Sequence, residues 1–365
     1  MASKPEEKTA TKTSFLKRKR VKQLAVLAFI VFNILIIYWT ASKELSREKT
    51  EGLEGPSFSW WLFLIAIISF ITALAADIYK YYILIFHFTK QKNVKLAAQT
   101  VLIGRYYDNI TPSAVGGQPF QIHHMHKHGN IDSAHAAMIP IIAFVSVQTA
   151  FVVLCFLTLL FGSGLVLSEV TYAASYIGIL LIAFAPGTIL FFALKPKVAK
   201  KIASSILKFL SKIHIVRNIE KTEEKTLGEI EKYAQTVRRV IKNRKLLVKV
   251  MALSFAYQGL LYSIPFLVVR AFGGDVGYIP ATMTAFTIQA AITFVPTPGN
   301  AGAAEGSFYL VFAHLGSGNT FWAMLIWRFF TYYAFIALGG LVYLEMAWQK
   351  KKHSLNAGNS ANSTN

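Results

Sequence analysis

Two stretches that combine proline with glycine decide the fold of this chain: TPSAVGGQPF at residues 111–120 and TPGNAGAAEGSF at residues 297–308. Each begins with Thr-Pro and has a glycine five residues after the threonine. Proline and glycine interrupt helices, yet both stretches lie in regions that are otherwise apolar. Broken backbone survives in a bilayer only where protein or a water-filled cavity surrounds it. The two stretches therefore predict a polar interior inside a membrane protein.

The composition supports an integral membrane protein. Hydrophobic residues make up 54% of the 365 residues, and charged residues only 15%, against about a quarter in soluble domains. A bilayer crossing needs about 20 apolar residues, and several runs approach or exceed that length, at 21–39, 138–161, 172–194 and 321–344.

Basic residues set the expected topology through the positive-inside rule. Residues 1–20 form a basic cytoplasmic tail, and the apolar run after Lys17–Arg20 is a retained crossing because no small-x-small cleavage site follows it. The next expected crossing, 58–78, ends near Asp77 and Lys80, which we assign to a helix end at the membrane interface. Lysines on both sides of the first break then favour a hairpin that enters from the cytoplasm and returns there.

The second half follows the same logic from the opposite side. Crossings near 138–161 and 172–194 lead to a charged cytoplasmic helical loop at 195–249, either lying on anionic headgroups or serving as a solvated connector. After a crossing at 246–272, residues 278–315 begin and end outside, and the last crossing at 321–346 runs inward to a basic, disordered cytoplasmic tail at 349–365.

These assignments predict an all-α polytopic membrane protein. Its membrane domain, residues 21–348, contains about six full transmembrane helices and two oppositely oriented re-entrant hairpins. That arrangement is an inverted repeat, which is typical of transporters with a central site.

Charged residues near the breaks are the candidate site, since ionisable groups at membrane depth are costly and face a polar interior. In one interpretation Arg105 or Arg328 binds a lipid phosphate, a carboxylate offsets the charge, and half-helix N-termini offer amides. In the other, Arg105 pairs with Asp108, and Arg328 with Glu305, as structural ion pairs. The candidate substrate-binding residues are Arg105, Asp108, Thr111, Pro112, Gly116, Gly117, Gln118, Pro298, Gly299, Asn300, Gly302, Glu305 and Arg328.

Other features indicate neither a metal nor a cofactor. His124 and His128 have the i,i+4 spacing of a helical metal pair, but no carboxylate or cysteine accompanies them, so a basic interfacial segment is favoured. The single Cys155 has no disulfide partner. We expect a lipid-facing role for the aromatic residues at 322–333. The net charge of +20 is spread over tails and loops, which predicts anionic lipid, and not nucleic acid, as the partner.

The segments RYYDNITPSAVGGQ at 105–118 and VPTPGNAGAAEG at 295–306 resemble the two signature segments of the flippase-like transmembrane region of lysylphosphatidylglycerol synthases. The resemblance spans about residues 20–348. This family includes the membrane half of the multiple peptide resistance factor. Two departures are visible: Gln118 stands where members often carry an acidic residue, and Ala304 where a basic residue often precedes the glutamate.

The resemblance implies a lipid translocase of the bacterial inner membrane, with both termini cytoplasmic. It would move an anionic or aminoacylated phospholipid such as lysyl-phosphatidylglycerol between leaflets, which modulates surface charge and resistance to cationic antimicrobial peptides. The alternatives are a phosphatidylglycerol lysyltransferase, a membrane subunit of a separately encoded lipid synthase, and a lipid-carrier glycosyltransferase. No D-x-D, H-E-x-x-H, G-x-S-x-G or phosphate-loop motif occurs, and the loop at 195–249 is too short for a tRNA-using domain, so enzymatic activity stays open.

Overall fold

The computed structural model describes residues 58–112, 116–161, 169–212, 218–314 and 319–362, together with Tyr38 and Ser42. The chain divides into two compact units, Met1–Gly55 and Pro56–Asn365. The expected first crossing at 21–39 and the basic tail at 1–20 lie outside the described residues, apart from Tyr38. The account below concerns the second unit.

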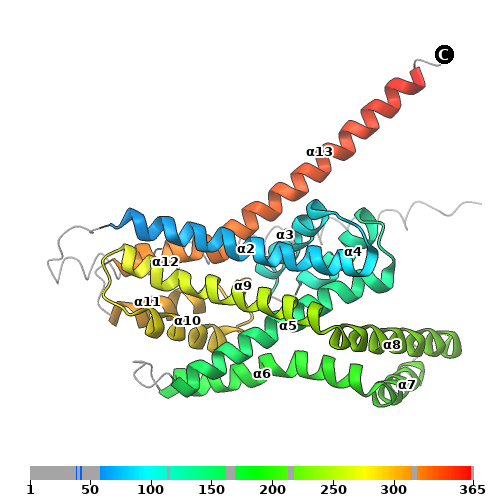
Figure 1. Cartoon of the computed structure of the whole chain (residues 1–365), viewed down its shortest axis with the longest axis horizontal. Helices are drawn as coiled ribbons and strands as arrows, with labels where there is room; N and C mark the ends of the chain where they lie inside the picture. Colours follow the sequence, from blue (N-terminus) through cyan, green and yellow to red (C-terminus); the bar gives the residue numbers. More distant parts are fainter. Residues whose placement is uncertain are drawn as a thin grey trace, which may run out of the picture. The chain divides into compact units, whose positions relative to one another are not determined.

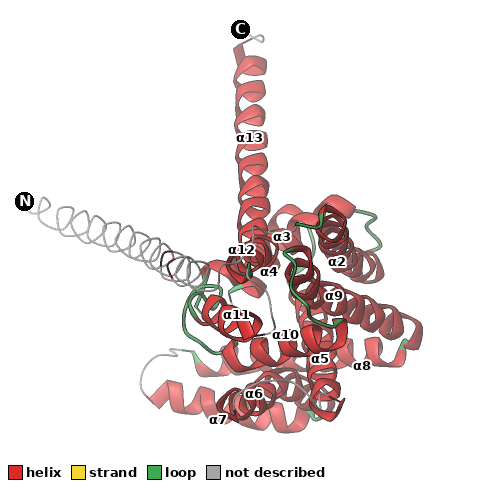
Figure 2. Ribbon diagram, turned by 90° about the vertical axis from the view of Figure 1, so that its left-hand side faces the viewer, coloured by secondary structure: helices red, strands yellow, loops and turns green. Residues whose placement is uncertain are grey.

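The described part of this unit is built from helices and connecting loops, with no strand among the residues that Figure 2 colours by structure. This agrees with the all-α fold predicted from sequence. The helices, labelled as in Figure 1, are α2 (Trp60–Thr89), α3 (Val94–Ile110), α4 (Gly117–His128), α5 (Ser133–Phe161), α6 (Glu169–Leu194), α7 (Pro196–Lys212), α8 (Ile219–Lys242), α9 (Arg244–Ala271), α10 (Tyr278–Ile292), α11 (Ala303–His314), α12 (Thr320–Arg328), the π-helix η1 (Phe329–Tyr333) and α13 (Ala334–Asn362).

Five helical segments are long and apolar enough to cross a membrane, and they correspond to five of the six expected crossings. They are Trp60–Thr89, Ser133–Thr158, Ala173–Leu194, Arg244–Ala271 and Thr320–Gln349. The last one is not a regular α-helix throughout, because η1 interrupts it directly after Arg328.

Helices α2 and α9 lie side by side along the middle of the unit (Figure 1). They run antiparallel, since the backbone amide of Ser59, before α2, donates to the carbonyl of Ala271 at the end of α9. Halfway along, the Ser69 hydroxyl donates to the carbonyl of Leu260 at 2.9 Å. This pair forms the frame to which both broken hairpins attach.

Each of the two breaks separates a pair of short helices. The first pair is α3 and α4, which pack against each other, and the second is α10 and α11. In Figure 1 the first pair lies toward the right end of the α2–α9 frame, and the second pair lies toward the left end. The two predicted hairpins are therefore present and come from opposite ends of the frame.

One boundary prediction is wrong and matters for the site. The second crossing was expected to end near residue 78, but α2 continues to Thr89 and ends only where Lys90 adopts the left-handed conformation, with φ of 60°. Asp77 and Lys80 are therefore not at a helix end. They are 2% and 1% exposed, because they pair with each other inside the fold.

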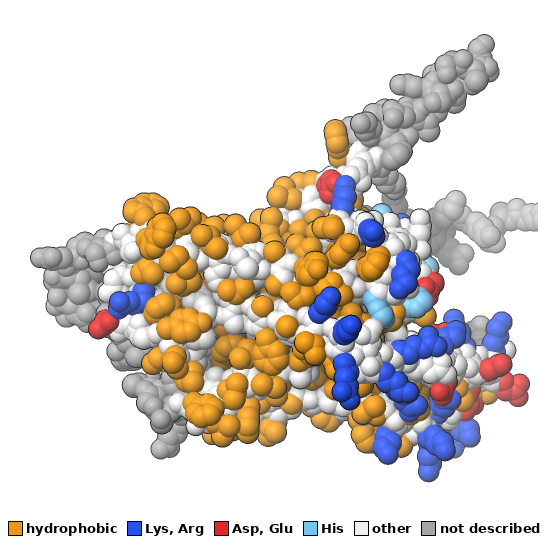
Figure 3. Space-filling view, viewed as in Figure 1, with side chains coloured by type: hydrophobic (Ala, Val, Ile, Leu, Met, Phe, Trp, Pro, Cys, Tyr) orange, Lys and Arg blue, Asp and Glu red, His pale blue; other side chains and the backbone are white. Residues whose placement is uncertain are grey.

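The charged loop is helical, as its pattern predicts. Lysine and arginine side chains gather at the end of the molecule where α7 and α8 lie (Figures 1 and 3). Helix α8 is fixed to the unit by the Tyr233 hydroxyl and the Arg238 guanidinium, which donate to the carbonyls of Ile189 and Leu194 in α6. Helix α7 buries none of its residues.

At the C-terminal end, α13 continues as helix to Asn362. The composition predicts a disordered tail from residue 349.

Candidate functional site

The two proline-glycine motifs meet in space. Pro112 and Pro298 form an isolated antiparallel β-bridge, although they are far apart in the sequence. Helix α3 stops at Thr111 because a residue before proline avoids helical geometry, and Thr111 is extended with ψ of 147°. Its hydroxyl donates to the carbonyl of Tyr107 and accepts from the amide of Gly116. The hydrogen bonds of Thr111 therefore connect α3 to Gly116 across the first break, and Pro112 contacts the second break.

The second break is a chain of tight turns. Gly299, Asn300 and Gly302 all have positive φ, of 57°, 56° and 89°, a region that glycine and asparagine tolerate best. A Cβ at Gly299 would lie 2.1 Å from the ring of Tyr332 in η1. Only glycine lets the backbone approach this closely.

A cavity of about 350 Å³ adjoins the meeting point of the motifs. Side chains from both hairpins, from the α2–α9 frame and from α5, α6 and the last crossing line it. It brings together six residues singled out from the sequence: Arg105, Asp108, Gln118, Gly299, Asn300 and Arg328. The other seven are adjacent in the chain but are not in its lining: Thr111, Pro112, Gly116, Gly117, Pro298, Gly302 and Glu305.

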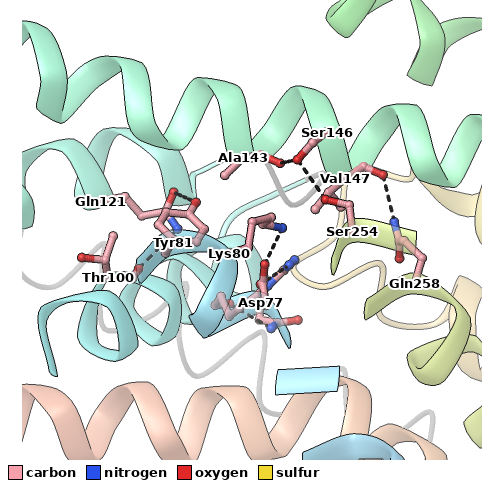
Figure 4. A network of polar contacts seen from close by, with 12 residues as sticks. Asp77, Lys80, Tyr81, Thr100, Gln121, Ala143, Ser146, Val147, Ser254 and Gln258 are labelled. Atoms are coloured by element: carbon pink, nitrogen blue, oxygen red, sulfur yellow. Dashed lines mark hydrogen bonds and ion pairs between the residues drawn. The ribbon is translucent and has the colours of Figure 1, made fainter. Parts of the chain in front are cut away.

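One side of the cavity holds a cluster of charges that the sequence assigned differently. The Arg105 guanidinium lies 2.7 Å from Oδ2 of Asp77, and not in an ion pair with Asp108 as the structural interpretation expected. Oδ1 of Asp77 lies 2.6 Å from the ammonium of Lys80. Figure 4 shows Asp77 and Lys80 pointing toward each other. The Arg105 guanidinium also lies 4.6 Å from the ring centroid of Tyr257 in α9.

The other arginine has the partner that was expected. Arg328 Nε donates to Glu305 Oε1 at 2.6 Å, and both side chains are almost fully buried. Its Nη2 donates to the carbonyl of Gly299, and its guanidinium lies over the ring of Tyr332 at 4.7 Å. Arg328 therefore ties the second motif to the last crossing.

The amides at the half-helix N-termini already have acceptors. Asp108 Oδ1 accepts from the Gly117 amide at the start of α4, and Glu305 Oε2 accepts from the Gly302 amide just before α11. The sequence analysis expected these amides to receive a phosphate. In this structure a carboxylate from the same hairpin stands at each one.

The cavity also has an apolar side. Phe144, Val147 and Phe151 of α5 line it, together with Leu181 of α6 and Phe294 just after α10. Leu181 and Phe294 are each 47% exposed. Two of the apolar lining residues are therefore also exposed at the surface of the described part of the chain.

Comparison with known proteins assigns the chain to a family. Residues 23–339 match the family model described as the lysylphosphatidylglycerol synthase TM region. The chain belongs to this family. It is similar to the "UPF0104 membrane protein" of Methanothermobacter thermautotrophicus, with 26% identity over 223 residues, which cover 59% of this chain and 64% of that relative. No solved structure matches the chain.

Both positions at which this family member departs from the expected family pattern line the cavity. They are Gln118 at the start of α4 and Ala304 at the start of α11. At these two places the lining is neutral.

The site contains residues that sequence reasoning missed. Asp77, Lys80, Tyr257 and Gln258 all line the cavity. A usable signal existed for the first two, because an acid and a base three residues apart within an apolar run are expected to face a polar interior. Nothing in the sequence distinguishes Tyr257 and Gln258 from other polar residues on α9.

The histidine cluster lies away from this cavity. His124 is 2% exposed, its ring stacks on that of His128, and neither of its ring nitrogens has a hydrogen-bond partner among the described residues. Within the described ranges no three histidine, cysteine, aspartate or glutamate side chains are grouped to hold a metal ion.

The aromatic residues of the last crossing are divided between two environments. Trp322 and Phe329 are about half exposed, in keeping with the expected lipid-facing role, whereas Phe330 and Tyr332 are buried. Trp327 lines the cavity.

Proposed function

We propose that this protein moves an anionic phospholipid between the two leaflets of a membrane. The observation that carries the proposal is the composition of the cavity: two arginines and a lysine lie in its lining together with Asp77 and Asp108, and its apolar part includes the exposed residues Leu181 and Phe294. A lipid has the same division, with a charged phosphodiester joined to acyl chains. The headgroup would enter the polar part while the chains remain in the bilayer.

Arg105 is the proposed phosphate ligand. Its side chain is 25% exposed, against 6% for Arg328, and it lies at the cavity wall. A guanidinium holds a phosphate with two parallel hydrogen bonds, which an ammonium cannot reproduce. Asp77 pairs with Arg105, so a phosphodiester would exchange with this carboxylate.

The family description suggests lysyl-phosphatidylglycerol as a second candidate substrate, and lysyl transfer to phosphatidylglycerol as a second candidate activity, either by this chain or with a separately encoded synthase. We propose the bacterial cytoplasmic membrane as its location, with both termini cytoplasmic, because basic residues then gather inside. Lower surface charge and resistance to cationic peptides would follow if the aminoacylated lipid is carried.

Reconstitution into vesicles with labelled phosphatidylglycerol tests the function. We expect leaflet transfer by the wild-type protein and strongly reduced transfer by an Arg105→Lys, Arg328→Lys double variant. Normal transfer by a folded double variant would remove the proposed phosphate site. An added arm with lysyl-tRNA separates the alternatives, since only a synthase would make lysyl-phosphatidylglycerol there.

Cysteine labelling in a Cys155→Ala background tests the membrane topology. Lys127→Cys follows the first break and Asp275→Cys precedes the second hairpin; both positions are exposed. An impermeant thiol reagent should label position 275 in intact cells and position 127 only in opened cells. Labelling of both from one side would contradict the opposite orientation of the hairpins.

A further inference from the structure

The polar lining of the cavity contains a set of neutral side chains that share one feature. Each donates a hydrogen bond to a backbone carbonyl, and each also has a side-chain oxygen that can accept one. Asn109 Nδ2 donates to the carbonyl of Arg105, and Gln258 Nε2 donates to that of Val147. The hydroxyls of Thr293 and Thr331 donate to the carbonyls of Gln289 and Trp327. All four residues line the cavity. Figure 4 shows the Gln258 contact.

Asn300 adds a fifth acceptor, and it is the one without a partner. Its side chain lines the cavity and is 5% exposed, and its Oδ1 is buried with no hydrogen-bond partner among the described residues. A buried polar atom without a partner lowers the stability of the fold. The surrounding turn holds Asn300 in place, since its amide donates to the carbonyl of Thr297 and its carbonyl accepts from the Ala304 amide. A ligand group that donates a hydrogen bond would remove this cost.

Of the three carboxylates at the site, Asp77 and Glu305 are in ion pairs, and Asp108 accepts only from a neutral amide. Asp77 pairs with Lys80 and Arg105, Asp108 accepts from the Gly117 amide, and Glu305 binds Arg328 and the Gly302 amide. The two aromatic faces nearest the arginines, those of Tyr257 and Tyr332, are covered by the guanidinium groups. A buried ammonium needs a carboxylate or an aromatic face, because neutral oxygens do not offset the loss of its hydration. A hydroxyl needs only a neutral acceptor.

We propose that the lipid carried has an uncharged polyol headgroup joined through one phosphodiester, with Asn300 as an acceptor for a headgroup hydroxyl, and that aminoacylated lipid is the poorer substrate. This rests on the proposed function, which it refines by naming the headgroup class. The phosphodiester meets Arg105, and the polyol meets the neutral oxygens of Asn109, Gln258 and Asn300.

Three labelled lipids test the headgroup class in reconstituted vesicles. Phosphatidylglycerol carries hydroxyls, phosphatidylethanol has the same phosphodiester charge without them, and lysyl-phosphatidylglycerol adds ammonium groups. We expect phosphatidylglycerol to move about tenfold faster than either of the others, the ratio that corresponds to about 1.4 kcal/mol. Equal rates for phosphatidylglycerol and phosphatidylethanol, or a preference for the lysyl lipid, would overturn the proposal.

Two substitutions at position 300 assign the effect to that residue, and both suit the left-handed backbone there. Asn300→Gly removes the acceptor and should abolish the preference for phosphatidylglycerol over phosphatidylethanol. Asn300→Asp supplies an extra carboxylate of the same shape and should raise the rate for lysyl-phosphatidylglycerol relative to phosphatidylglycerol. An unchanged preference in Asn300→Gly, as a folded protein, would contradict the role of Asn300.

A binding measurement separates this inference from translocation itself. Short-chain forms of the same three lipids are added to the detergent-solubilised protein, and the shift in melting temperature is recorded. A larger shift with the polyol lipid and no leaflet transfer of any lipid would overturn the translocase function and leave the headgroup inference supported. Equal shifts with all three would overturn the headgroup inference.

Discussion

The two breaks have the same kinds of group around them, an arginine, a carboxylate and a half-helix amide, but these groups are connected differently. At the second break one carboxylate binds both the arginine and the amide, since Glu305 contacts Arg328 and the Gly302 amide. At the first break two different carboxylates make these two contacts. Asp108 binds the Gly117 amide, while Asp77, from α2, binds Arg105.

This difference gives the hairpins different freedom. Arg328 is buried and bonded to Gly299 and Glu305 of the second motif, so moving it would disrupt the second break. Arg105 is partly exposed and is held by a carboxylate from another helix, so it can exchange partners while the first break stays closed. The comparison supports the proposal that Arg105 meets the ligand, with the second hairpin as a fixed support.

The largest effect is expected from Glu305→Gln. Removing one partner of a buried ion pair costs about 3–5 kcal/mol, because Arg328 is left buried without a counter-charge. The melting temperature in detergent should fall strongly. Asp275→Asn is the control, since its pair with Arg270 is exposed and exposed pairs contribute little. Equal melting temperatures of Glu305→Gln and wild type would show that the second hairpin is not fixed by this pair.

Gly299→Ala should have the next largest effect, about 2–4 kcal/mol from left-handed strain and crowding together. The added methyl group would meet the ring of Tyr332. Gly306→Ala is the matched control in the same hairpin, because a Cβ there meets nothing within 4 Å. Thermal unfolding of both variants measures the difference. A Gly299→Ala protein as stable as Gly306→Ala would mean that the close approach of the motif to η1 is unimportant.

The two arginines should respond differently to the same conservative change. Arg105→Lys should lower phosphatidylglycerol transfer about tenfold, or about 1.4 kcal/mol, with little loss of stability, whereas Arg328→Lys should lower the melting temperature first. Transfer rate and melting temperature are measured for both. If Arg328→Lys alone loses transfer without losing stability, the roles of the hairpins are reversed.

The smallest effect is the one expected on stability when the pH is lowered. Burial, with smaller contributions from the nearby His128 and His123, lowers the pKa of His124 in the first hairpin to about 4. Between pH 6.5 and 4 the unfolded chain takes up a proton that native His124 does not, so native stability falls as the pH falls through this window. We expect the melting temperature to drop across this window, and to drop less in His124→Leu. The exposed His123→Leu should retain the drop, and an equal drop in His124→Leu would exclude His124 as its source.

The sequence predicted the fold, but only part of the candidate site. The difference is physical, since the fold follows from local features and the site depends on contacts between distant residues. Apolar runs and proline-glycine breaks are local features, so five crossings and both hairpins could be read directly. The pairing of charges is not local. Arg105 finds its partner on α2, 28 residues away, and the sequence offered the nearer Asp108 instead. Glu305 and Arg328 were paired correctly because they are the only charged residues between Asp275 and Glu345 in the sequence.

The bridge between Pro112 and Pro298 has a mechanical consequence. Two hairpins that enter from opposite ends and touch at their tips share one fulcrum. A tilt of the hairpins about this point that widens the cavity at one end of the bundle would narrow the cavity at the other end. Under the proposed function, such a tilt would admit a lipid headgroup from one end of the bundle while the other end is narrowed.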